Sequence, residues 1–208
     1  MASEATVHPG RAARTDPNDR IEQILTVAVS VFAEQGYRAT SMNDLAVAAG
    51  ISKPGLYHYF KSKEQLLVLL YESVLAQHAA EERDVPAGGM TATESLRAIL
   101  TKRIVFSCEQ QRLQRIFTEE EAEVPDELMG VIRQQRQDRE DYLVQLIESG
   151  VRAREFHLDT SPRIAVRAMV GAANFCYKWY DPAGRKTPRE IAHDVSTFLM
   201  RSLGVSLP

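Results

Sequence analysis

The sequence has few of the residues from which metal centres and disulfide frameworks are built. Its two cysteines, Cys108 and Cys176, lie far apart, and neither belongs to a Cys-x-x-Cys pair or to a His/Cys cluster with zinc-ligand spacing. We therefore expect no metal and no cofactor, and we expect two buried, reduced thiols in a cytoplasmic protein rather than a disulfide. No apolar run approaches the ~18 residues of a membrane span, and the N-terminus lacks the apolar segment of a secretory signal.

Alternation of apolar and polar residues, which is typical of strands, is also missing, so we predict an all-α fold without a sheet. Catalytic patterns are missing as well. There is no nucleophile elbow, no phosphate-binding glycine loop and no pair of carboxylates on one predicted wall. The alternative class of an enzyme is therefore disfavoured, and we predict that the protein is not one.

Neither sign of charge predominates, because the sequence has 25 Lys and Arg and 28 Asp and Glu, which gives a formal net charge of −3. Such a balance does not predict nucleic-acid binding, but it does not exclude it where basic residues are segregated. No acidic residue lies between Lys53 and Lys63, whereas residues 119–123 read EEEAE, as on a solvated acidic surface. The 53–63 segment can therefore present a basic face.

The segment around which the chain is organised is 40–63, TSMNDLAVAAGISKPGLYHYFKSK, which has the pattern of two short helices joined by a tight turn. Ser41 is a favourable N-cap for the first helix, and Gly50 ends it because glycine adopts the positive φ of the turn without a steric penalty. Ser52 then caps the second helix. Two such helices are typical of a helix-turn-helix whose second helix enters the major groove of DNA.

The outward residues of this segment have the chemistry of a DNA interface. Small residues allow the backbone to approach the duplex, and tyrosine, histidine and lysine donate hydrogen bonds to phosphates and base edges. We assign to the DNA interface Thr40, Ser41, Lys53, Pro54, Gly55, Tyr57, His58, Tyr59, Lys61 and Lys63. Within this set we expect Lys53 and Gly55 nearest the bases and Lys63 on a phosphate. The alternatives are an ordinary helical hairpin with a solvated basic face, and a protein-interaction module that has lost DNA binding.

Several short motifs follow one another without insertion between Ile21 and Leu70. They are Gly36-Tyr37, Thr40-Ser41-Met42, Asp44-Leu45-Ala46, Ala49-Gly50-Ile51-Ser52, Leu56-Tyr57, Tyr59-Phe60 and Lys63-Glu64-Leu66-Leu67. Together they resemble the DNA-binding domain of the TetR family of bacterial transcriptional regulators. The resemblance implies an all-helical homodimer, most simply a repressor, that binds a palindromic operator in double-stranded DNA. It also implies that a small-molecule effector in the C-terminal domain releases the operator.

The periodicity divides the chain into three parts. Residues 1–18 have no period and are expected to form a disordered tail, in which Arg11 and Arg14 are either plainly solvated or part of an arm that reaches DNA. Residues 19–65 form the helix-turn-helix DNA-binding domain, and residues 66–208 form the effector-binding and dimerisation domain. We expect about nine helices in total; apart from the two short ones above, they span 19–35, 62–82, 91–110, 112–122, 125–153, 161–180 and 188–203.

The last two predicted helices differ from the others. The 161–180 helix is apolar or small around nearly its whole circumference, which indicates burial on two sides, and the 188–203 helix carries one apolar stripe. We predict a dimer seam in which both helices meet their symmetry mates as a four-helix bundle. The alternative is a helix buried wholly within one subunit.

Two features predict where an effector binds. Gln135 and Arg139 share the predicted inward face of the 125–153 helix, where they either pair with an internal acid or meet an anionic or carbonyl-bearing ligand. A shift in helical phase that leaves them simply exposed is a further alternative. The aromatic cluster at 174–180 is either core or a pocket wall. We assign to the effector site Phe106, Phe117, Gln135, Arg139, Tyr142, Asn174 and Trp179. Asn174, followed by Trp179-Tyr180 and a Pro-Gly loop, also resembles a TetR subgroup that responds to acyl-coenzyme A thioesters, which implies an effector with an apolar tail and a polar head.

Overall fold

The computed structural model describes residues 17–83 and 89–205, and within them the chain is all-helical, as predicted. The predicted N-terminal tail lies outside these residues, except for Pro17 and Asn18, which belong to the first helix. No helix of the described part is both long and apolar enough to cross a membrane. The elements are α1 (Pro17–Gln35), α2 (Met42–Ala48), α3 (Lys53–Tyr59), α4 (Lys63–Arg83), α5 (Ala92–Glu109), α6 (Gln111–Glu119), the 3-10 turn η1 (Glu121–Glu123), α7 (Asp126–Arg152), α8 (Pro162–Asn174), α9 (Cys176–Trp179) and α10 (Pro188–Arg201).

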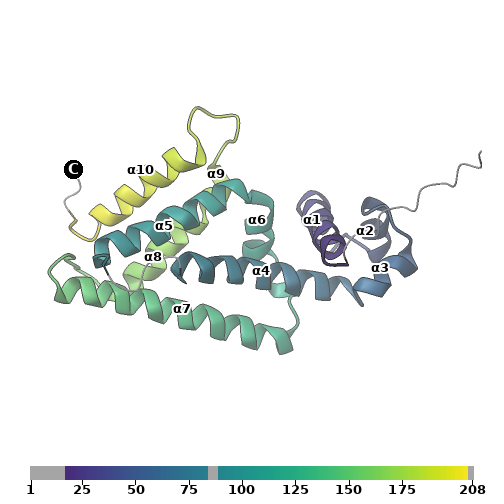
Figure 1. Cartoon of the computed structure of the whole chain (residues 1–208), viewed down its shortest axis with the longest axis horizontal. Helices are drawn as coiled ribbons and strands as arrows, with labels where there is room; N and C mark the ends of the chain where they lie inside the picture. The colour runs from purple at the N-terminus through teal and green to yellow at the C-terminus, as the bar shows by residue number, and fades with distance from the viewer. Residues whose placement is uncertain (1–16, 84–88, 206–208) are drawn as a thin grey trace, which may run out of the picture.

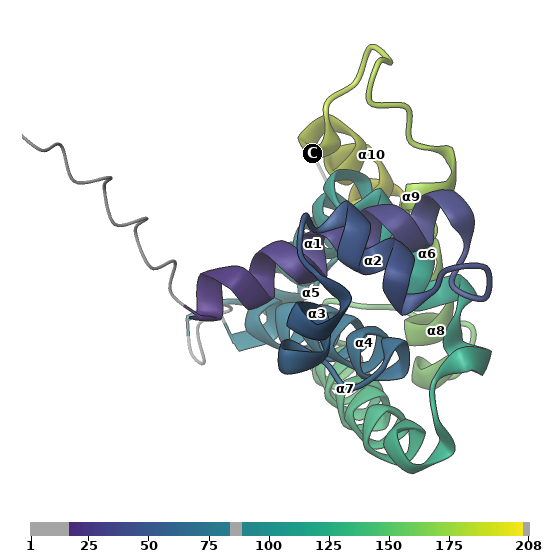
Figure 2. The same ribbon diagram turned by 90° about the vertical axis from the view of Figure 1, so that its right-hand side faces the viewer.

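The molecule is elongated, with α1 to α3 at one end and α5, α7, α8 and α10 at the other (Figure 1). Helix α4 starts beside α3 and runs into the larger lobe, where it lies between α6 and α7 (Figure 1). Seen from the end, α1, α2 and α3 stand in front of the rest of the chain (Figure 2). The small end therefore projects from the body, and α4 connects the two.

Helices α2 and α3 form where their local signals predict. Ser41 and Asp44 make both bonds of a capping box, with the Ser41 amide 2.9 Å from Oδ2 of Asp44 and the Asp44 amide 3.2 Å from Oγ of Ser41. Gly50 ends α2 with φ of 63°, which glycine adopts readily. Oγ of Ser52 accepts a hydrogen bond of 3.1 Å from the amide of Gly55 at the start of α3. These caps confirm the predicted helix-turn-helix.

One hydrophobic core extends from the small end into the body. In α4, Leu67, Tyr71 and Val74 are fully buried, and they share a cluster with residues of α1, α2 and α3. The same cluster includes Ile116 and Phe117 of α6, together with part of α7. The domain boundary expected near residue 65 falls at the start of α4, and apolar packing is continuous across it.

A second core fills the body around α5. It joins α5 to α7, α8 and α10, and its buried members include Ile104, Ile147, Met169 and Met200. Helix α10 packs along α5, and α7 lies on the opposite side (Figure 1). Helix α7 contributes buried residues to both cores and therefore connects them.

The helix expected at 161–180 is wrong as a single element, because it is interrupted at Phe175 between α8 and α9. The cause is the hydroxyl of Ser107 on α5, which donates to the carbonyl of Asn174 at 2.8 Å and accepts from the amide of Tyr177 at 2.9 Å. A side chain that takes over two backbone groups breaks the helical ladder. This break accounts for ten α-helices in the described chain where nine were expected.

The two cysteines, which are far apart in the sequence, come together in the fold. Cys108 on α5 and Cys176 at the start of α9 are both buried, as predicted. A hydrogen bond with Cys176, together with burial, raises the pKa of the Cys108 thiol. The protonated thiol therefore behaves as a small apolar group that joins α5 to α9.

Two glycines of α7 provide a matched test of its packing. A Cβ atom at buried Gly150 would stand 2.3 Å from Cδ2 of Phe156 and 3.0 Å from Cβ of Ala92, whereas one at exposed Gly130 would meet nothing within 4 Å. We expect Gly150→Ala to destabilise the protein by ~1–3 kcal/mol through overpacking. Gly130→Ala should stabilise it by up to ~1 kcal/mol through helix propensity. Urea unfolding measures both, and a stabilised Gly150→Ala variant would contradict the described packing of α7 against α5.

Candidate DNA interface and ligand cavity

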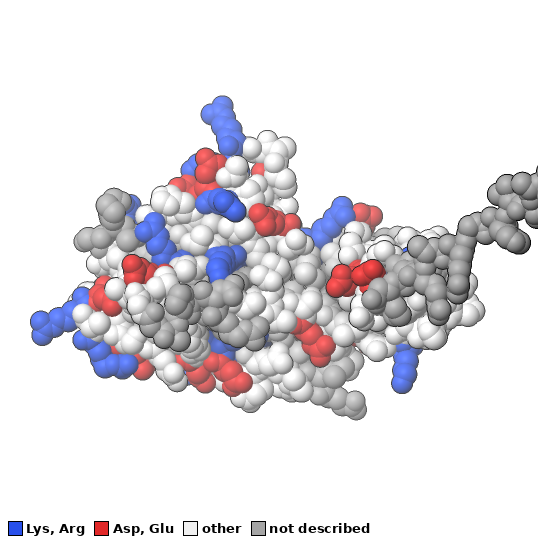
Figure 3. Space-filling view, in the orientation of Figure 1, with Lys and Arg blue, Asp and Glu red and all other residues white. Residues whose placement is uncertain are grey.

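Helix α3 presents most of the predicted DNA-binding residues at the small end of the molecule. Lys53, Pro54, His58 and Lys61 are exposed, and Tyr57 keeps 45% of its surface in solvent. The larger lobe intersperses Lys and Arg with Asp and Glu on the face in Figure 3, so the whole-chain charge says little about any one surface. The exposed lysine, histidine and tyrosine side chains of α3 therefore have to be considered on the surface of this helix alone.

A shallow groove beside α3 brings predicted residues from different segments together. It has a volume of about 470 Å³, and Ser41, Lys53, Tyr57 and Lys61 line it. Gly55 lies beside the N-cap, where a Cβ atom would stand 3.1 Å from Oγ of Ser52. A side chain at this position would therefore crowd the cap as well as any approaching duplex.

Thr40 and Lys63 also line this groove, and both make hydrogen bonds within the protein. Thr40 is only 2% exposed and its Oγ1 donates to the carbonyl of Gly36 at 2.8 Å. Nζ of Lys63 donates to the carbonyls of Tyr37 at 3.0 Å, Thr40 at 3.1 Å and Arg38 at 3.4 Å, and it lies 4.4 Å from the centroid of the Tyr37 ring. The Lys63 ammonium, at the start of α4, therefore donates its hydrogen bonds to backbone carbonyls of the α1–α2 loop.

Tyr59 also has an internal role. It is half-buried against the N-terminal core, with its ring edge-on to His58 at 5.2 Å between centroids. The residues assigned to the DNA interface thus form two groups. One group is exposed on and beside α3, and the other stabilises the conformation of the helix-turn-helix segment.

A cavity of about 410 Å³ lies in the body between α4, α5, α6, α7, α8 and α9. Three of the seven predicted effector-site residues line it: Phe117, Arg139 and Asn174. Phe106 stands behind the lining, edge-on to His78 at 5.7 Å between ring centroids. The cavity therefore brings three of the predicted residues together, and the other four are not among its lining residues.

Gln135, Tyr142 and Trp179 do not line the cavity, which corrects their assignment. Gln135 is exposed, Tyr142 keeps 39% of its surface in solvent and Trp179 keeps 50%. On α7 the error is one of helical phase. The buried stripe runs through Met129, Ile132, Leu143 and Ile147, and the cavity face consists of Arg136, Arg139, Glu140 and Leu143.

Sequence reasoning missed two buried polar residues of the cavity wall, His78 on α4 and Arg103 on α5, each only 4% exposed. Both lie at helical spacing within buried apolar stripes, and a polar residue in such a stripe was the available signal. Burial, followed by the charges of Arg103, Arg139 and Arg136, lowers the pKa of His78 to about 2. The imidazole is therefore neutral at physiological pH.

The arginines of α7 are held by partners within the protein. Nη1 of Arg136 lies 2.6 Å from Oε2 of Glu121, and its guanidinium covers the ring of Phe117 at 4.7 Å from the centroid. Arg139 donates to the carbonyl of Leu75 on α4. Arg136 and Arg139 are thus bonded within the protein, and both line the cavity.

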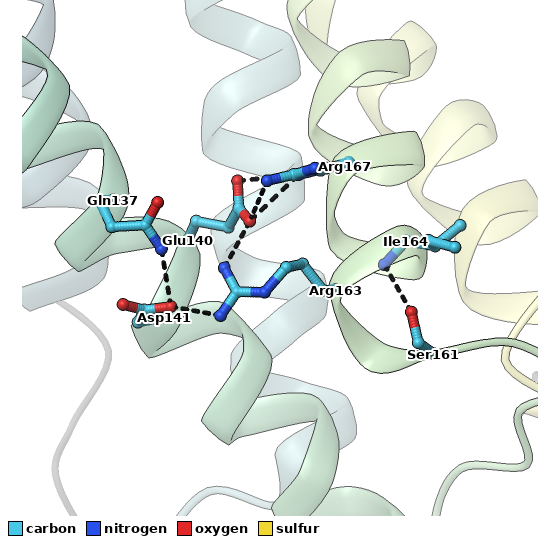
Figure 4. A network of polar contacts seen from close by, with 7 residues as sticks. All are labelled: Gln137, Glu140, Asp141, Ser161, Arg163, Ile164 and Arg167. Atoms are coloured by element: carbon cyan, nitrogen blue, oxygen red, sulfur yellow. Dashed lines mark hydrogen bonds and ion pairs between the residues drawn. The ribbon is translucent and has the colours of Figure 1, made fainter.

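An ion-pair network joins α7 to α8 at the edge of the cavity (Figure 4). Arg163 forks between Glu140 at 2.6 Å and Asp141 at 2.7 Å, and Arg167 reaches Glu140 at 3.0 Å. Although burial opposes it, hydrogen bonds from Arg167 and Arg163 lower the pKa of Glu140. Arg167 lines the cavity, whereas Arg163 is not among the residues described in its wall.

Comparison with known proteins identifies the family. The family description "Bacterial regulatory proteins, tetR family" matches residues 24–70, and "Tetracyclin repressor-like, C-terminal domain" matches residues 89–203. The chain belongs to the TetR family. This TetR-family protein is a DNA-binding, ligand-responsive transcriptional regulator with an N-terminal helix-turn-helix and a helical C-terminal domain.

Relatives match this TetR-family protein over most of its length. The HTH-type transcriptional repressor KstR2 of Rhodococcus jostii (strain RHA1) is 26% identical over 185 residues, which cover 88% of this chain and 91% of the relative. The structure of a TetR/AcrR-family regulator from Thermobifida fusca YX-ER1 is 31% identical, with a TM-score of 0.68 over 88% of this chain and 97% of that one. The structure of AibR with isovaleryl coenzyme A and operator DNA is 25% identical, with a TM-score of 0.76 over 87% and 98%.

Substitutions at Lys63 and Lys61 together distinguish a lysine that stabilises the fold from a lysine that contacts DNA. Lys63→Met removes the ammonium from three backbone carbonyls, so we expect thermal stability to fall by ~1–3 kcal/mol. Lys61→Met removes an exposed charge, so we expect unchanged stability and weaker binding to all DNA sequences alike. Its salt slope should fall by about one unit per half-site.

Thermal unfolding and gel shifts at several salt concentrations, with DNA flanking the protein's own gene, measure both effects. A Lys63→Met variant with wild-type stability but a reduced salt slope would restore the phosphate role first expected of Lys63.

Proposed function

We propose that the protein is a cytoplasmic repressor, without enzymatic activity, that binds a palindromic operator as a homodimer and releases it when an acyl-coenzyme A thioester occupies the cavity. Residues 19–65 would bind DNA, and residues 66–208 would bind the effector and the second subunit. The observation that carries the proposal is the position of Phe117. This residue belongs to the core that holds α1 to α3, and it also lines the cavity.

The exposed face of α3 supports the DNA-binding part of the proposal. Lys53, Tyr57, His58 and Lys61 offer donors to phosphates and base edges, while Gly55 lets the helix start approach the duplex. A single α3 reads one half-site, and a two-fold dimer reads two half-sites in a palindrome. Thr40, Tyr59 and Lys63 contribute by holding this face in shape.

The exposed apolar surface of the last helices supports the dimer. Phe198 on α10 is 73% exposed, Ile164 on α8 is 59% exposed, and Phe175 and Trp179 are each about half exposed. Ala172, also exposed on α8, is small enough for a partner helix to approach closely. Apolar surface of this kind marks an interaction site, and a second copy of α8 and α10 is the natural cover in a two-fold dimer.

The lining of the cavity supports an acyl thioester as effector. Apolar side chains such as Leu75, Leu143 and Val166 line it together with arginines. Arg136 and Arg167 are partly exposed and suit the phosphates of coenzyme A, since a guanidinium binds two oxygens at once. A volume of about 410 Å³ holds an acyl chain and leaves the nucleotide outside. The isovaleryl coenzyme A bound to the related AibR is a ligand of this class.

The dimer is tested with two apolar-to-acid substitutions. Phe198→Glu would bury an unpaired charge at the seam, at several kcal/mol, so we expect monomers in light scattering at micromolar concentration and loss of operator binding. Val131→Glu, at a 56% exposed position on α7, should leave the dimer and DNA binding intact. A stable wild-type monomer under the same conditions would remove the dimer from the proposal.

The effector class is tested by a thermal-shift screen that sets a panel of acyl-coenzyme A thioesters against planar cationic compounds. We expect thioesters to raise Tm and to release operator DNA in gel shifts. Arg167→Gln should weaken thioester binding about fivefold, as for a part-exposed ion pair of ~1 kcal/mol. Arg163→Gln is the control, because Arg163 shares the same carboxylates. Stabilisation by cationic compounds alone would show that the pocket chemistry is wrong, while the repressor function would stand.

A further inference from the structure

The wall of the cavity has a polar inner part and a more exposed outer part. His78 and Arg103 are each 4% exposed, whereas Phe175 is 51% exposed and the Arg167 side chain 64%. The two buried residues come from α4 and α5, which lie within the body (Figure 1), while Phe175 and Arg167 lie on the side of α8. An acyl chain that enters from the arginines of α7 and α8 therefore ends against His78 and Arg103.

The inner wall contains polar atoms whose hydrogen-bonding capacity is unused. Among the described residues, Nε2 of His78 and Oδ1 of Asn174 are buried and have no hydrogen-bond partner, and both residues line the cavity. Buried polar groups in folded proteins are nearly always satisfied, so an exception needs an explanation. His78 is otherwise well packed, with its ring edge-on to Phe106 at 5.7 Å and to Phe117 at 6.1 Å. A fixed ring with one unused nitrogen is arranged to meet a ligand atom.

The charges near His78 determine which ligand atom fits. Burial, followed by the charges of Arg103 and Arg139, keeps the imidazole neutral, and these guanidiniums also give the inner wall a positive potential. A neutral imidazole can carry its proton on Nε2 and donate it. A positive environment favours an oxygen that carries partial or full negative charge, and it disfavours an ammonium group. The complementary ligand group is a carbonyl or carboxylate oxygen.

We propose, resting on the proposed function, that the acyl group of the effector carries a ketone or carboxylate oxygen beyond the thioester, and that this oxygen accepts a hydrogen bond from Nε2 of His78 beside Arg103. Simple alkanoyl thioesters fit the same apolar wall of Leu75, Leu143 and Val166, but they leave His78 without a partner. A site built to hydrogen-bond a ligand group discriminates strongly against the analogue that lacks it.

The test compares two isosteric thioesters, 5-oxohexanoyl-coenzyme A and 5-methylhexanoyl-coenzyme A, which differ only by an oxygen in place of a methyl group. Titration calorimetry on the full-length protein should give the oxo ligand about tenfold higher affinity or more. Adipoyl-coenzyme A and 6-methylheptanoyl-coenzyme A, which have the same branched shape and equal numbers of acyl heavy atoms, repeat the comparison for a carboxylate. Higher affinity for the oxygen-bearing ligand in the first pair alone identifies a ketone. Higher affinity for the oxygen-bearing ligand in the second pair alone identifies a carboxylate.

Substitution of His78 assigns the preference to this residue. His78→Leu keeps an apolar side chain against Phe106 and Phe117, and we expect it to bind the methyl ligand as wild type does and to lose the preference for the oxo ligand. His78→Gln, which retains a donor, should recover part of the preference. His157→Leu is the control, because the His157 side chain is 83% exposed and not among the described residues of the cavity wall. Wild-type operator binding, together with a Tm without ligand that is no lower than that of wild type, shows that each variant is folded.

Three outcomes overturn the inference, and they can be distinguished. Equal affinities within both isosteric pairs for the wild-type protein would remove the oxygen-bearing acyl group and leave the acyl-thioester effector in place. A preference that persists in His78→Leu would remove His78 as its cause. Failure of every thioester to bind would overturn this inference together with the proposed effector class, and DNA binding would be unaffected.

Discussion

The contact on which the structure depends most is that between Tyr71 and Phe117. Tyr71 is fully buried on α4, its ring centroid lies 4.9 Å from that of Phe117, and its hydroxyl donates to the carbonyl of Ile116 at 3.2 Å. Burial raises the pKa of Tyr71, so the hydroxyl keeps its proton and remains a donor. Phe117 also lies against the guanidinium of Arg136 and lines the cavity. One aromatic pair thus belongs both to the core of the DNA-binding end and to the wall of the ligand site.

This shared core explains how an occupant of the cavity can act on α3. Packed interiors switch between discrete arrangements and do not deform continuously, so a displaced Phe117 must move α6 or α4 as a unit. Exposed ion pairs, such as Arg38 with Glu123 at 2.6 Å and Arg112 with Glu34 at 3.3 Å, also link the two ends. Pairs of this kind contribute little energy, so the apolar contact carries the coupling. An effector that reverses a 99:1 preference must supply ~5.5 kcal/mol of differential affinity.

The ends of the helices were predictable from the sequence because capping hydrogen bonds and glycine turns involve residues only a few positions apart. The N-caps Ser41 and Ser52 each satisfy backbone amides within three residues, and Gly36 and Gly50 adopt positive φ at the ends of α1 and α2. The break at Phe175 could not be predicted in this way, because its cause is a hydroxyl 67 residues away in the sequence. The helical periodicity of residues 161–180 contains no information about that contact with α5.

The candidate site was only partly predictable, for the same physical reason. Lys63 lies among lysines that face solvent, yet its ammonium finds three carbonyls that only the tertiary turn brings together. On α7, polar residues occupy so many positions that the apolar stripe is sparse, and a phase error of one residue replaced Arg136 with Gln135. By contrast, His78 and Arg103 occupy places that the helical period reserves for apolar side chains. Such departures from the pattern indicate function more reliably than agreement with it.

The buried polar wall also explains why ligand binding and stability are linked in this protein. A buried imidazole nitrogen such as Nε2 of His78 costs ~1–3 kcal/mol when it has no hydrogen-bond partner. A ligand oxygen that accepts from this nitrogen would remove that penalty. Ligand at a hundredfold excess over Kd adds ~2.7 kcal/mol of stability by mass action. Under the proposed function, the same hydrogen bond would contribute to the ligand's preference for one arrangement of α4 and α6, and so to the movement of α3.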